Sequence, residues 1–231
     1  MTTLFIVATP IGNLEDLSMR ALRILKEVDF ILCEDTRVTK KLLNHYDIKK
    51  PLLSYHQHSR LKKVNYILEL LKQGKNLALI SDAGTPGISD PGNLLVDEAI
   101  KRLMEKVKII PIPGPSAVTA AASISGFPMD KFLFLGFPPT KRKRKKFFQE
   151  VIKSKYPVIF YESPYRIIKS LRDLQLISKT YNLKPKIVVC REVTKKFETI
   201  YRGEIEEVIK EIEKDIIKGE FVIIVESDRR R

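Results

Sequence analysis

Three loops rich in glycine and proline each follow a short apolar run that is typical of a buried strand. They are Ala8-Thr-Pro-Ile-Gly-Asn13, Ser81-Asp-Ala-Gly-Thr-Pro-Gly-Ile-Ser-Asp-Pro-Gly92 and Pro111-Ile-Pro-Gly-Pro-Ser-Ala117. Glycine lets a backbone approach a ligand closely, and proline holds a loop preformed. Taken singly, each loop is more typical of an ordinary tight turn. Because ligands bind at the carboxyl ends of the strands in an open parallel sheet, three such loops together favour a ligand site.

Two phosphate-binding motifs are absent from these loops. No G-x-G-x-x-G opens a helix, and no glycine precedes a Lys-Ser or Lys-Thr pair. The first absence argues against a dinucleotide fingerprint and the second against a P-loop NTPase. A nucleoside ligand would therefore be held mainly by backbone groups and apolar side chains.

The segment Glu34-Asp35-Thr36-Arg37 places two carboxylates and a guanidinium at the end of another apolar run. A carboxylate there can orient or deprotonate a hydroxyl group, and Arg37 can grip a phosphate. The alternative is a helix N-terminus with Asp35 or Thr36 as the N-cap. The sequence leaves both interpretations open.

Positive charge is abundant and uneven. The 231 residues hold 42 Lys and Arg against 28 Asp and Glu, a net charge of +14. Residues 1–113 hold 17 basic and 13 acidic side chains, and residues 114–231 hold 25 and 15. A surplus of this size predicts attraction to a polyanion, mainly by the second half.

The strongest basic feature is a run of six consecutive cations. We call it the basic run, and it is followed by Phe147 and Phe148, which we expect to pack in the core. The alternative is a solvated helix start, but within so basic a half the run favours contact with RNA phosphates. Its members are Lys141, Arg142, Lys143, Arg144, Lys145 and Lys146.

Several other classes of protein are not expected. Cys33 and Cys190 are far apart in apolar runs, which does not indicate a disulfide framework. The sequence contains no run of about eighteen apolar residues, so no transmembrane helix is predicted. The N-terminus lacks the basic start of a signal peptide. His56 and His58 have no nearby Cys or third His, so no metal site is predicted. We expect a cytoplasmic protein.

The elements that must position these residues follow an alternating pattern. In the first half, strands are predicted at 4–8, 30–33, 77–80 and 107–112, and helices at 18–27, 37–45, 61–72 and 94–104. The alternation predicts a largely parallel sheet covered on both faces. A domain boundary is predicted between residues 113 and 114, where prolines and a glycine cluster. In the second half, strands are predicted at 132–137, 158–162, 187–190, 199–202 and 221–226, and helices at 116–125, 143–154, 165–178 and 205–217.

Together the motifs resemble the family of ribosomal RNA small-subunit methyltransferase I, in the tetrapyrrole methylase superfamily. The three loops and Cys33-Glu-Asp-Thr-Arg37 carry this resemblance. It continues in order through Phe134-Leu-Gly-Phe137, Phe160-Tyr-Glu-Ser-Pro-Tyr-Arg166 and Arg191-Glu-Val-Thr-Lys-Lys196. Each motif is weak alone, but the set spans essentially the whole chain. Many members of the family extend further after the last strand, so RNA contacts of such an extension are expected to be missing here or supplied elsewhere.

The resemblance implies two α/β domains with S-adenosylmethionine bound in a cleft between them, and a homodimer. It implies 2′-O-methylation of a cytidine ribose in 16S rRNA, with naked rRNA or the small ribosomal subunit as partner. In that setting, Glu34 or Asp35 would orient or deprotonate the 2′-hydroxyl, and Arg37 would grip a phosphate.

Residues that the resemblance assigns to the cofactor come from both halves. Thr85 stands where tetrapyrrole enzymes usually place Asp, so Asp82 becomes a candidate for contacting the methionine amine. Glu162 would face either the cofactor or the Arg166 guanidinium. The full set is Pro10, Gly12, Asp82, Gly84, Thr85, Pro86, Ile88, Ser116, Ala117, Tyr161, Glu162, Val193 and Thr194.

Two other functions compete with this interpretation. One is a small-molecule methyltransferase acting on a tetrapyrrole, against which the basic run and Thr85 argue. The other is an RNA-binding ribosome-assembly factor without catalytic activity, which would bind no S-adenosylmethionine.

Overall fold

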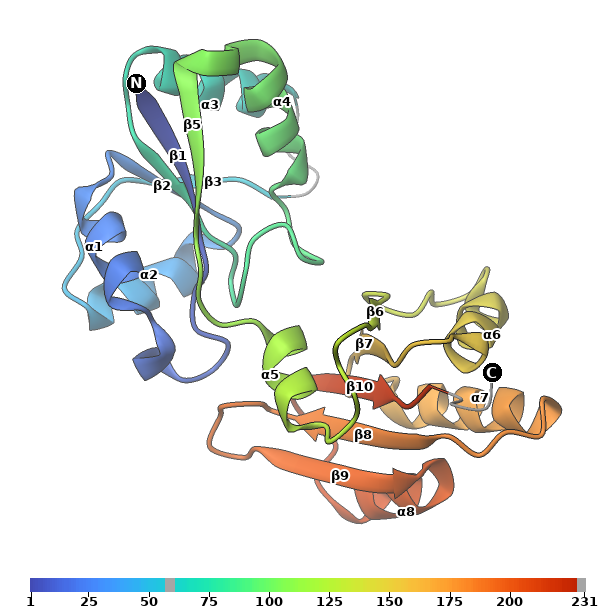
Figure 1. The fold of residues 1–231 in the computed structure, drawn as a ribbon. Coiled ribbons are helices and arrows are strands. Elements are labelled where there is room, and N and C mark those ends of the chain that lie inside the picture. Colours follow the sequence, from blue (N-terminus) through green and yellow to red (C-terminus); the bar gives the residue numbers. More distant parts are fainter. Residues whose placement is uncertain (57–60, 228–231) are drawn as a thin grey trace. The chain divides into compact units, whose positions relative to one another are not determined.

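The computed structural model describes residues 1–56 and 61–227. The chain divides into two compact units, Met1–Ser116 and Ala117–Arg231. Figure 1 labels their helices and strands. Among the described residues, none of the helices combines the length and the apolar composition needed to cross a bilayer.

The first unit is built on a parallel sheet of five strands in the order β3-β2-β4-β1-β5. This arrangement is the one that the alternating pattern predicts. The strands are β1 (Thr2–Val7), β2 (Phe30–Cys33), β3 (Leu52–Ser54), β4 (Leu77–Leu79) and β5 (Val107–Ile112). The helices are α1 (Met19–Glu27), α2 (Thr36–His45), α3 (Leu61–Lys72) and α4 (Asn93–Leu103), with short 3-10 turns η1 (Leu14–Asp16) and η2 (Met104–Lys106).

Helices cover both faces of this sheet. Successive residues of a strand point to opposite faces, so Leu32 packs in one core cluster and Ile31 in another. The first cluster includes Leu68 of α3, and the second includes Leu25 of α1. Because both faces are buried, the strands are mostly apolar, and this is why the sequence reveals most of them.

The second unit is built on a mixed sheet in the order β6-β7-β10-β8-β9. Only the β6–β7 pair is parallel, and the other three pairs are antiparallel. The strands are β6 (Leu133–Phe134), β7 (Val158–Glu162), β8 (Lys186–Arg191), β9 (Thr199–Glu204) and β10 (Phe221–Val225). The helices are α5 (Ala117–Ile124), α6 (Arg144–Lys153), α7 (Ile167–Thr180) and α8 (Ile205–Lys214).

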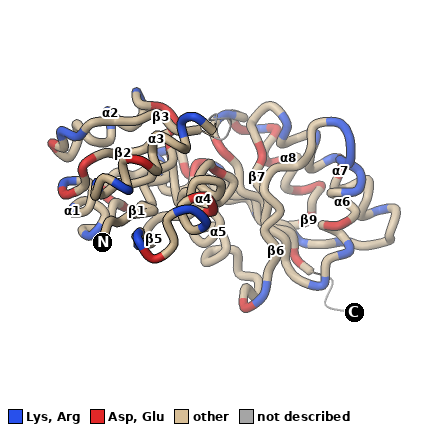
Figure 2. Tube along the Cα trace, turned by 90° about the horizontal axis from the view of Figure 1, so that it is seen from above, with Lys and Arg blue, Asp and Glu red and all other residues tan. Residues whose placement is uncertain are grey.

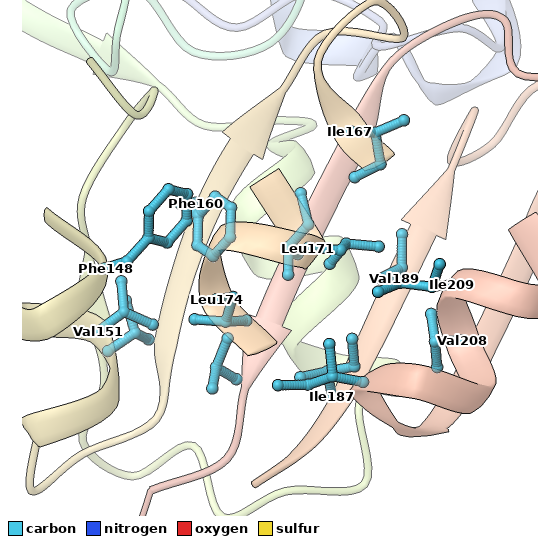
Figure 3. Close-up of a cluster of buried hydrophobic side chains, with 14 of the residues drawn as sticks. Phe148, Val151, Phe160, Ile167, Leu171, Leu174, Ile187, Val189, Val208 and Ile209 are labelled. Carbon is cyan, nitrogen blue, oxygen red and sulfur yellow. The ribbon is translucent and has the colours of Figure 1, made fainter. Parts of the chain in front are cut away.

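The main core of this unit lies between the sheet and helices α6, α7 and α8. Figure 3 shows Phe148 of α6, Phe160 of β7 and Leu171 of α7 converging there, and all three are fully buried. Phe147 joins the same cluster, as predicted. Helix α5 packs on β10 and β7. The strand residues Val222 and Ile224 are buried outside the main core, which is consistent with α5 covering the second face.

Three elements differ most from the sequence prediction. Strand β3 was not predicted, because it is three half-buried residues long and lies at a sheet edge. Strand β6 covers two residues instead of six, since Gly136 adopts a φ of 62° and two prolines follow it. Helix α8 ends at Lys214 instead of residue 217, and Ile216 is exposed instead of lying on its apolar stripe.

Candidate functional site

The three glycine- and proline-rich loops meet at one edge of the first unit's sheet. Strands β4, β1 and β5 are neighbours, so their carboxyl ends lie side by side. Thr9 and Gly84 exchange two backbone hydrogen bonds of 2.9 and 3.0 Å. The Thr85 hydroxyl donates to the carbonyl of Pro115 at 3.2 Å. These bonds join the three loops into one preformed surface.

Glycine is required where the loops touch. Gly84 has a φ of 80°, and a Cβ there would stand 3.4 Å from Ile11. At Gly114 a Cβ would stand 3.1 Å from the Ala8 side chain. Gly84 is therefore favoured by its left-handed backbone conformation, and Gly114 by its close contact with Ala8.

The loop residues assigned to the cofactor differ in exposure. Pro10, Gly84 and Pro86 are buried, and Thr85 is half-buried. Ile88 is 46% exposed, so it offers an apolar side chain to a ligand. Gly12 and Asp82 are exposed, and Ser116 and Ala117 are half-buried.

An acidic group lies beside these loops, at the carboxyl ends of β2 and β4. Glu34 follows β2 directly, and Asp82 and Asp90 belong to the loop after β4. The backbone N–H of Asp35 donates to Asp82 at 3.2 Å, and the backbone N–H of Asp82 donates to Glu34. The two strand ends are therefore tied together through carboxylates.

Glu34 has the properties of a general base. Burial, reinforced by the negative charges of Asp90 and Asp82, raises the pKa of Glu34 to about 7. Its Oε1 is buried and has no hydrogen-bond partner among the described residues. A carboxylate with one free oxygen and a pKa near neutrality can accept a proton at physiological pH.

Asp35 has the opposite character. Its side chain caps α2 by accepting from the Arg37 N–H at 2.8 Å, as the helix-start interpretation predicts. It also pairs with the Arg37 guanidinium at 2.6 Å, and these bonds lower the pKa of Asp35 to about 2. Asp35 is thus a poor base. The Arg37 side chain remains 86% exposed and keeps donors for an anion.

Glu162 is held inside the second unit. Its side chain is fully buried, with Oε1 2.7 Å from the Arg166 guanidinium and 2.8 Å from the backbone N–H of Ser163. The hydroxyl of Ser170 donates to Oε2 at 2.5 Å. Of the two partners that the sequence allows, the structure selects Arg166. Both oxygens of the Glu162 side chain are thus engaged internally, and its assignment to the cofactor stays a prediction.

Arg144 belongs to the same buried network. It is 8% exposed, and its guanidinium donates to Asp173 at 2.7 Å, Ser170 at 2.8 Å and the Pro139 carbonyl at 3.1 Å. The expectation that all six cations of the basic run contact RNA is therefore wrong for Arg144. The other five are exposed, and Figure 2 shows the run as a blue stretch entering α6.

Two further residues assigned to the cofactor lie in the loop after β8. Val193 is buried. Thr194 has a φ of 67°, which is unusual for a β-branched residue. Its Oγ1 is buried, with no hydrogen-bond partner among the described residues. A strained residue with an orphaned hydroxyl is typical of a binding site.

Sequence reasoning missed three residues. Asp90 is the charge that most strongly affects Glu34, and only the fold brings its loop to that position. Phe137 and Tyr165 are 52% and 96% exposed. The Phe137 ring lies 5.4 Å from that of Tyr161, the remaining residue assigned to the cofactor. In the sequence, the signal for these two exposed aromatic residues was their position next to prolines.

Residues 1–56 and 61–227 contain no group of three or more His, Cys, Asp or Glu side chains that could hold a metal ion. His58, considered above with His56, lies outside these residues.

Comparison with known proteins identifies the class. The family model for Tetrapyrrole (Corrin/Porphyrin) Methylases matches residues 3–209. The solved methyltransferase CobJ shares the fold with a TM-score of 0.71 at 18% identity, over 98% of this chain and 95% of its own. The cobalt precorrin-4 methyltransferase CbiF shares the fold with a TM-score of 0.69 at 18% identity, over 97% of this chain and 94% of its own. The chain is thus a methylase of the tetrapyrrole methylase class.

Curated relatives define the family more narrowly. A protein of Halalkalibacterium halodurans is 47% identical over 98% of this chain and 76% of its own length. A protein of Thermotoga maritima is 45% identical over 97% of this chain and 98% of its own length. A protein of Mycoplasmopsis pulmonis is 46% identical over 97% of this chain and 97% of its own length. Each is named ribosomal RNA small subunit methyltransferase I. The chain belongs to this family.

Methylases of this class take their methyl group from S-adenosylmethionine, and the residues present fit that molecule. The joined loops offer backbone groups and the exposed apolar Ile88 to an adenosyl group. The carboxylates of Glu34, Asp82 and Asp90 suit a ligand with a positively charged sulfonium and amine.

We predict that Glu34→Gln stabilises the protein increasingly as pH rises. Between its ordinary pKa near 4.5 and about 7, folded Glu34 keeps a proton that the unfolded chain releases. The free energy of unfolding of the wild type therefore falls across this window. Urea unfolding should show the variant's advantage growing from pH 4.5 to 7 and then staying constant. Glu105→Gln, an exposed control, should show no such growth; a gain for Glu34→Gln that is equal at every pH would contradict the prediction.

Proposed function

We propose that this protein transfers a methyl group from S-adenosylmethionine to the 2′-hydroxyl of a cytidine ribose in 16S rRNA. Identity of 45–47% over nearly the whole chain to relatives named as methyltransferases of small-subunit rRNA supports the choice of RNA. The observation that carries the choice of a hydroxyl nucleophile is Glu34, because a ribose hydroxyl needs a base and Glu34 is poised to act as one.

Glu34 acts on the nucleophile. When bound, S-adenosylmethionine supplies a methyl carbon already activated by its sulfonium, so catalysis consists mainly of positioning and proton removal. The Glu34 carboxylate would accept the 2′-hydroxyl proton as the hydroxyl oxygen takes the methyl group, and the sulfonium sulfur of the bound cofactor would leave as a neutral thioether. The acidic neighbours keep the carboxylate basic enough for this transfer.

The residues around Glu34 bind the RNA and the cofactor. Asp35 fixes the start of α2 and orients Arg37, whose exposed guanidinium contacts a phosphate of the RNA. Asp82, whose side chain is exposed, pairs with the methionine amine. The loops around Gly84 and Ser116 bind the rest of the cofactor.

The exposed members of the basic run contact the RNA backbone. Lys141, Arg142, Lys143, Lys145 and Lys146 are exposed. The loop before them is fixed, because Arg166 donates to the Pro138 carbonyl at 3.3 Å and Arg144 to that of Pro139. That loop presents Phe137, which with Tyr165 suits stacking on unpaired bases.

Two alternatives remain distinct from this proposal. A tetrapyrrole methyltransferase shares the fold, but the likeness to CobJ and CbiF is at 18% identity and concerns the fold alone. A catalytically silent RNA-binding factor would have no use for a base at Glu34. We further propose that the protein works as a homodimer, which sedimentation can test.

The proposed function predicts labelled methyl transfer to RNA. Purified protein with radiolabelled S-adenosylmethionine should label small ribosomal subunits or naked 16S rRNA, and mapping should place the methyl group on a cytidine 2′-oxygen. Parallel incubations should use a precorrin-type tetrapyrrole, and calorimetry should measure cofactor binding. Labelling of the tetrapyrrole alone would favour the first alternative, and failure to bind the cofactor the second. A methyl group on a base would contradict the 2′-hydroxyl assignment.

The pH dependence of kcat/KM is predicted to follow Glu34. The rate should rise with pH through about 7, as the carboxyl ionises. Asp90→Asn removes a negative charge that raises this pKa, so the rising limb should move to lower pH. Glu34→Gln should abolish the limb and slow transfer by about 10²–10⁴-fold.

Asp97→Asn is the matched control for Asp90→Asn, because Asp97 is exposed on α4 and paired with Lys101. Its pH profile should equal that of the wild type. A rising limb that persists in Glu34→Gln would mean that another group titrates.

The basic run should control RNA affinity and not cofactor affinity. Lys141→Gln/Lys143→Gln is expected to weaken binding of 16S rRNA fragments and to reduce the slope of log K against log salt by about 1.5. Lys184→Gln/Lys186→Gln, two exposed cations of the same unit, is the control. Equal effects of the two pairs would indicate general attraction without a defined contact.

A further inference from the structure

A pocket of about 500 Å³ lies in the first unit between α2 and the segment that leads into β3. One wall is a stripe of α2, since its residues follow the three- and four-residue spacing of one helix face. The other wall comes from the chain just after the helix. The lining residues are Thr36, Lys40, Leu43, Asn44, Ile48, Lys49, Lys50 and Leu52.

A chain reversal at the end of α2 builds this pocket. Asp47 adopts a φ of 53°, and the Ile48 N–H donates to the Leu43 carbonyl at 2.9 Å. Ile48 is thereby buried against Leu43, and together they form an apolar floor. The reversal brings Lys49 and Lys50 back beside the helix face that carries Lys40.

The pocket has the charge of an anion site. Lys40, Lys49 and Lys50 have no ion-pair partner among the described residues, and no acidic side chain lines the pocket. The segment 36–52 holds five basic residues and one acidic residue, whereas the rest of residues 1–113 holds twelve of each sign. The whole positive surplus of the first unit therefore lies in the segment that forms this pocket.

The residues that line the pocket can contact other parts of a ligand besides a phosphate. Thr36 and Asn44 supply hydrogen-bonding groups, and Leu43, Ile48 and Leu52 supply apolar surface. The volume is within the range of small-molecule sites. Ammonium groups beside hydrogen-bonding groups and an apolar floor match the phosphate, sugar and base of one nucleotide.

The position of the pocket connects it to Glu34. Thr36, the first residue of α2, lies two positions after Glu34 and lines the pocket. From Thr36 to Asn44 the pocket wall extends about 12 Å along the helix. A strand whose target ribose lies at Glu34 can therefore continue over α2 and place a neighbouring nucleotide in the pocket.

We propose that this pocket binds one nucleotide of the RNA substrate, next to the ribose that is methylated. This inference rests on the proposed function and adds a second RNA contact, in the unit that carries the base. The three lysines hold the phosphate, and the apolar floor holds the face of the nucleobase. A free nucleoside monophosphate shares this chemistry and serves as the competing ligand in the test.

The test variant is Lys40→Gln/Lys49→Gln, which neutralises one cation on each wall. Lys50 is left unchanged because it also lowers the pKa of Asp29, beside the Asp29–Lys75 pair. The control is Lys106→Gln/Lys108→Gln. These two exposed lysines lie at the end of η2 and in β5, and β5 is at the opposite sheet edge from β3.

Fluorescence anisotropy with a short single-stranded RNA should show affinity reduced about tenfold in the test variant, with the salt slope reduced by about 1.5. In methyl transfer, KM for RNA should rise while kcat and the Kd for S-adenosylmethionine stay unchanged. Indistinguishable losses in test and control variants would overturn the proposal.

Nuclear magnetic resonance separates the sources of the ligand. The RNA oligonucleotide should shift the amide signals of Thr36 and Asn44 in the wild type more strongly than cytidine monophosphate does, and inorganic phosphate should shift them least. Stronger binding of the free mononucleotide, or equal binding of phosphate, would overturn the assignment to an RNA nucleotide. Because this assay needs no methyl transfer, it judges the pocket even if the wild type fails to methylate rRNA.

Discussion

The parallel pairing of β2, β4, β1 and β5 is the constraint on which the candidate site depends. Strands that run the same way end at the same edge, so everything that follows them in the chain is gathered there. Three loops become one surface through the bonds between Thr9 and Gly84 and between Thr85 and Pro115. The same rule puts Glu34 beside Asp82, although 47 residues separate them in the chain.

This gathering creates the electrostatic situation of Glu34. A single hydrated glutamate at a strand end would keep its ordinary pKa of 4.5 and be ionised at neutral pH. Partial burial and two acidic neighbours make the same group half-ionised near neutrality. Asp35, one residue later, has a cationic partner and a helix to cap, and stays ionised. Adjacent carboxylates thus acquire different chemistry from their surroundings alone.

The fold was predictable where periodicity and burial agree. The apolar strands of the first unit and the stripe of α8 up to Ile212 follow from the sequence. Strand β3 could not be predicted, because its three half-buried residues show no hydrophobic periodicity. Within the site, Glu34 could be named as a candidate, but its preference over Asp35 required the positions of Asp82 and Asp90. Glu162 had two possible partners in the sequence, and only the packing of β7 against α7 decides for Arg166.

Arg144 shows that a run of like charges can conceal a residue of another kind. Its planar guanidinium reaches Asp173, Ser170 and the Pro139 carbonyl at once, which the single ammonium of a lysine cannot do. The five exposed positions around it require only a positive charge, so lysine and arginine are interchangeable there. Exchange of lysine and arginine is therefore expected to be tolerated at these five positions, whereas Arg144→Lys would lose part of the buried network.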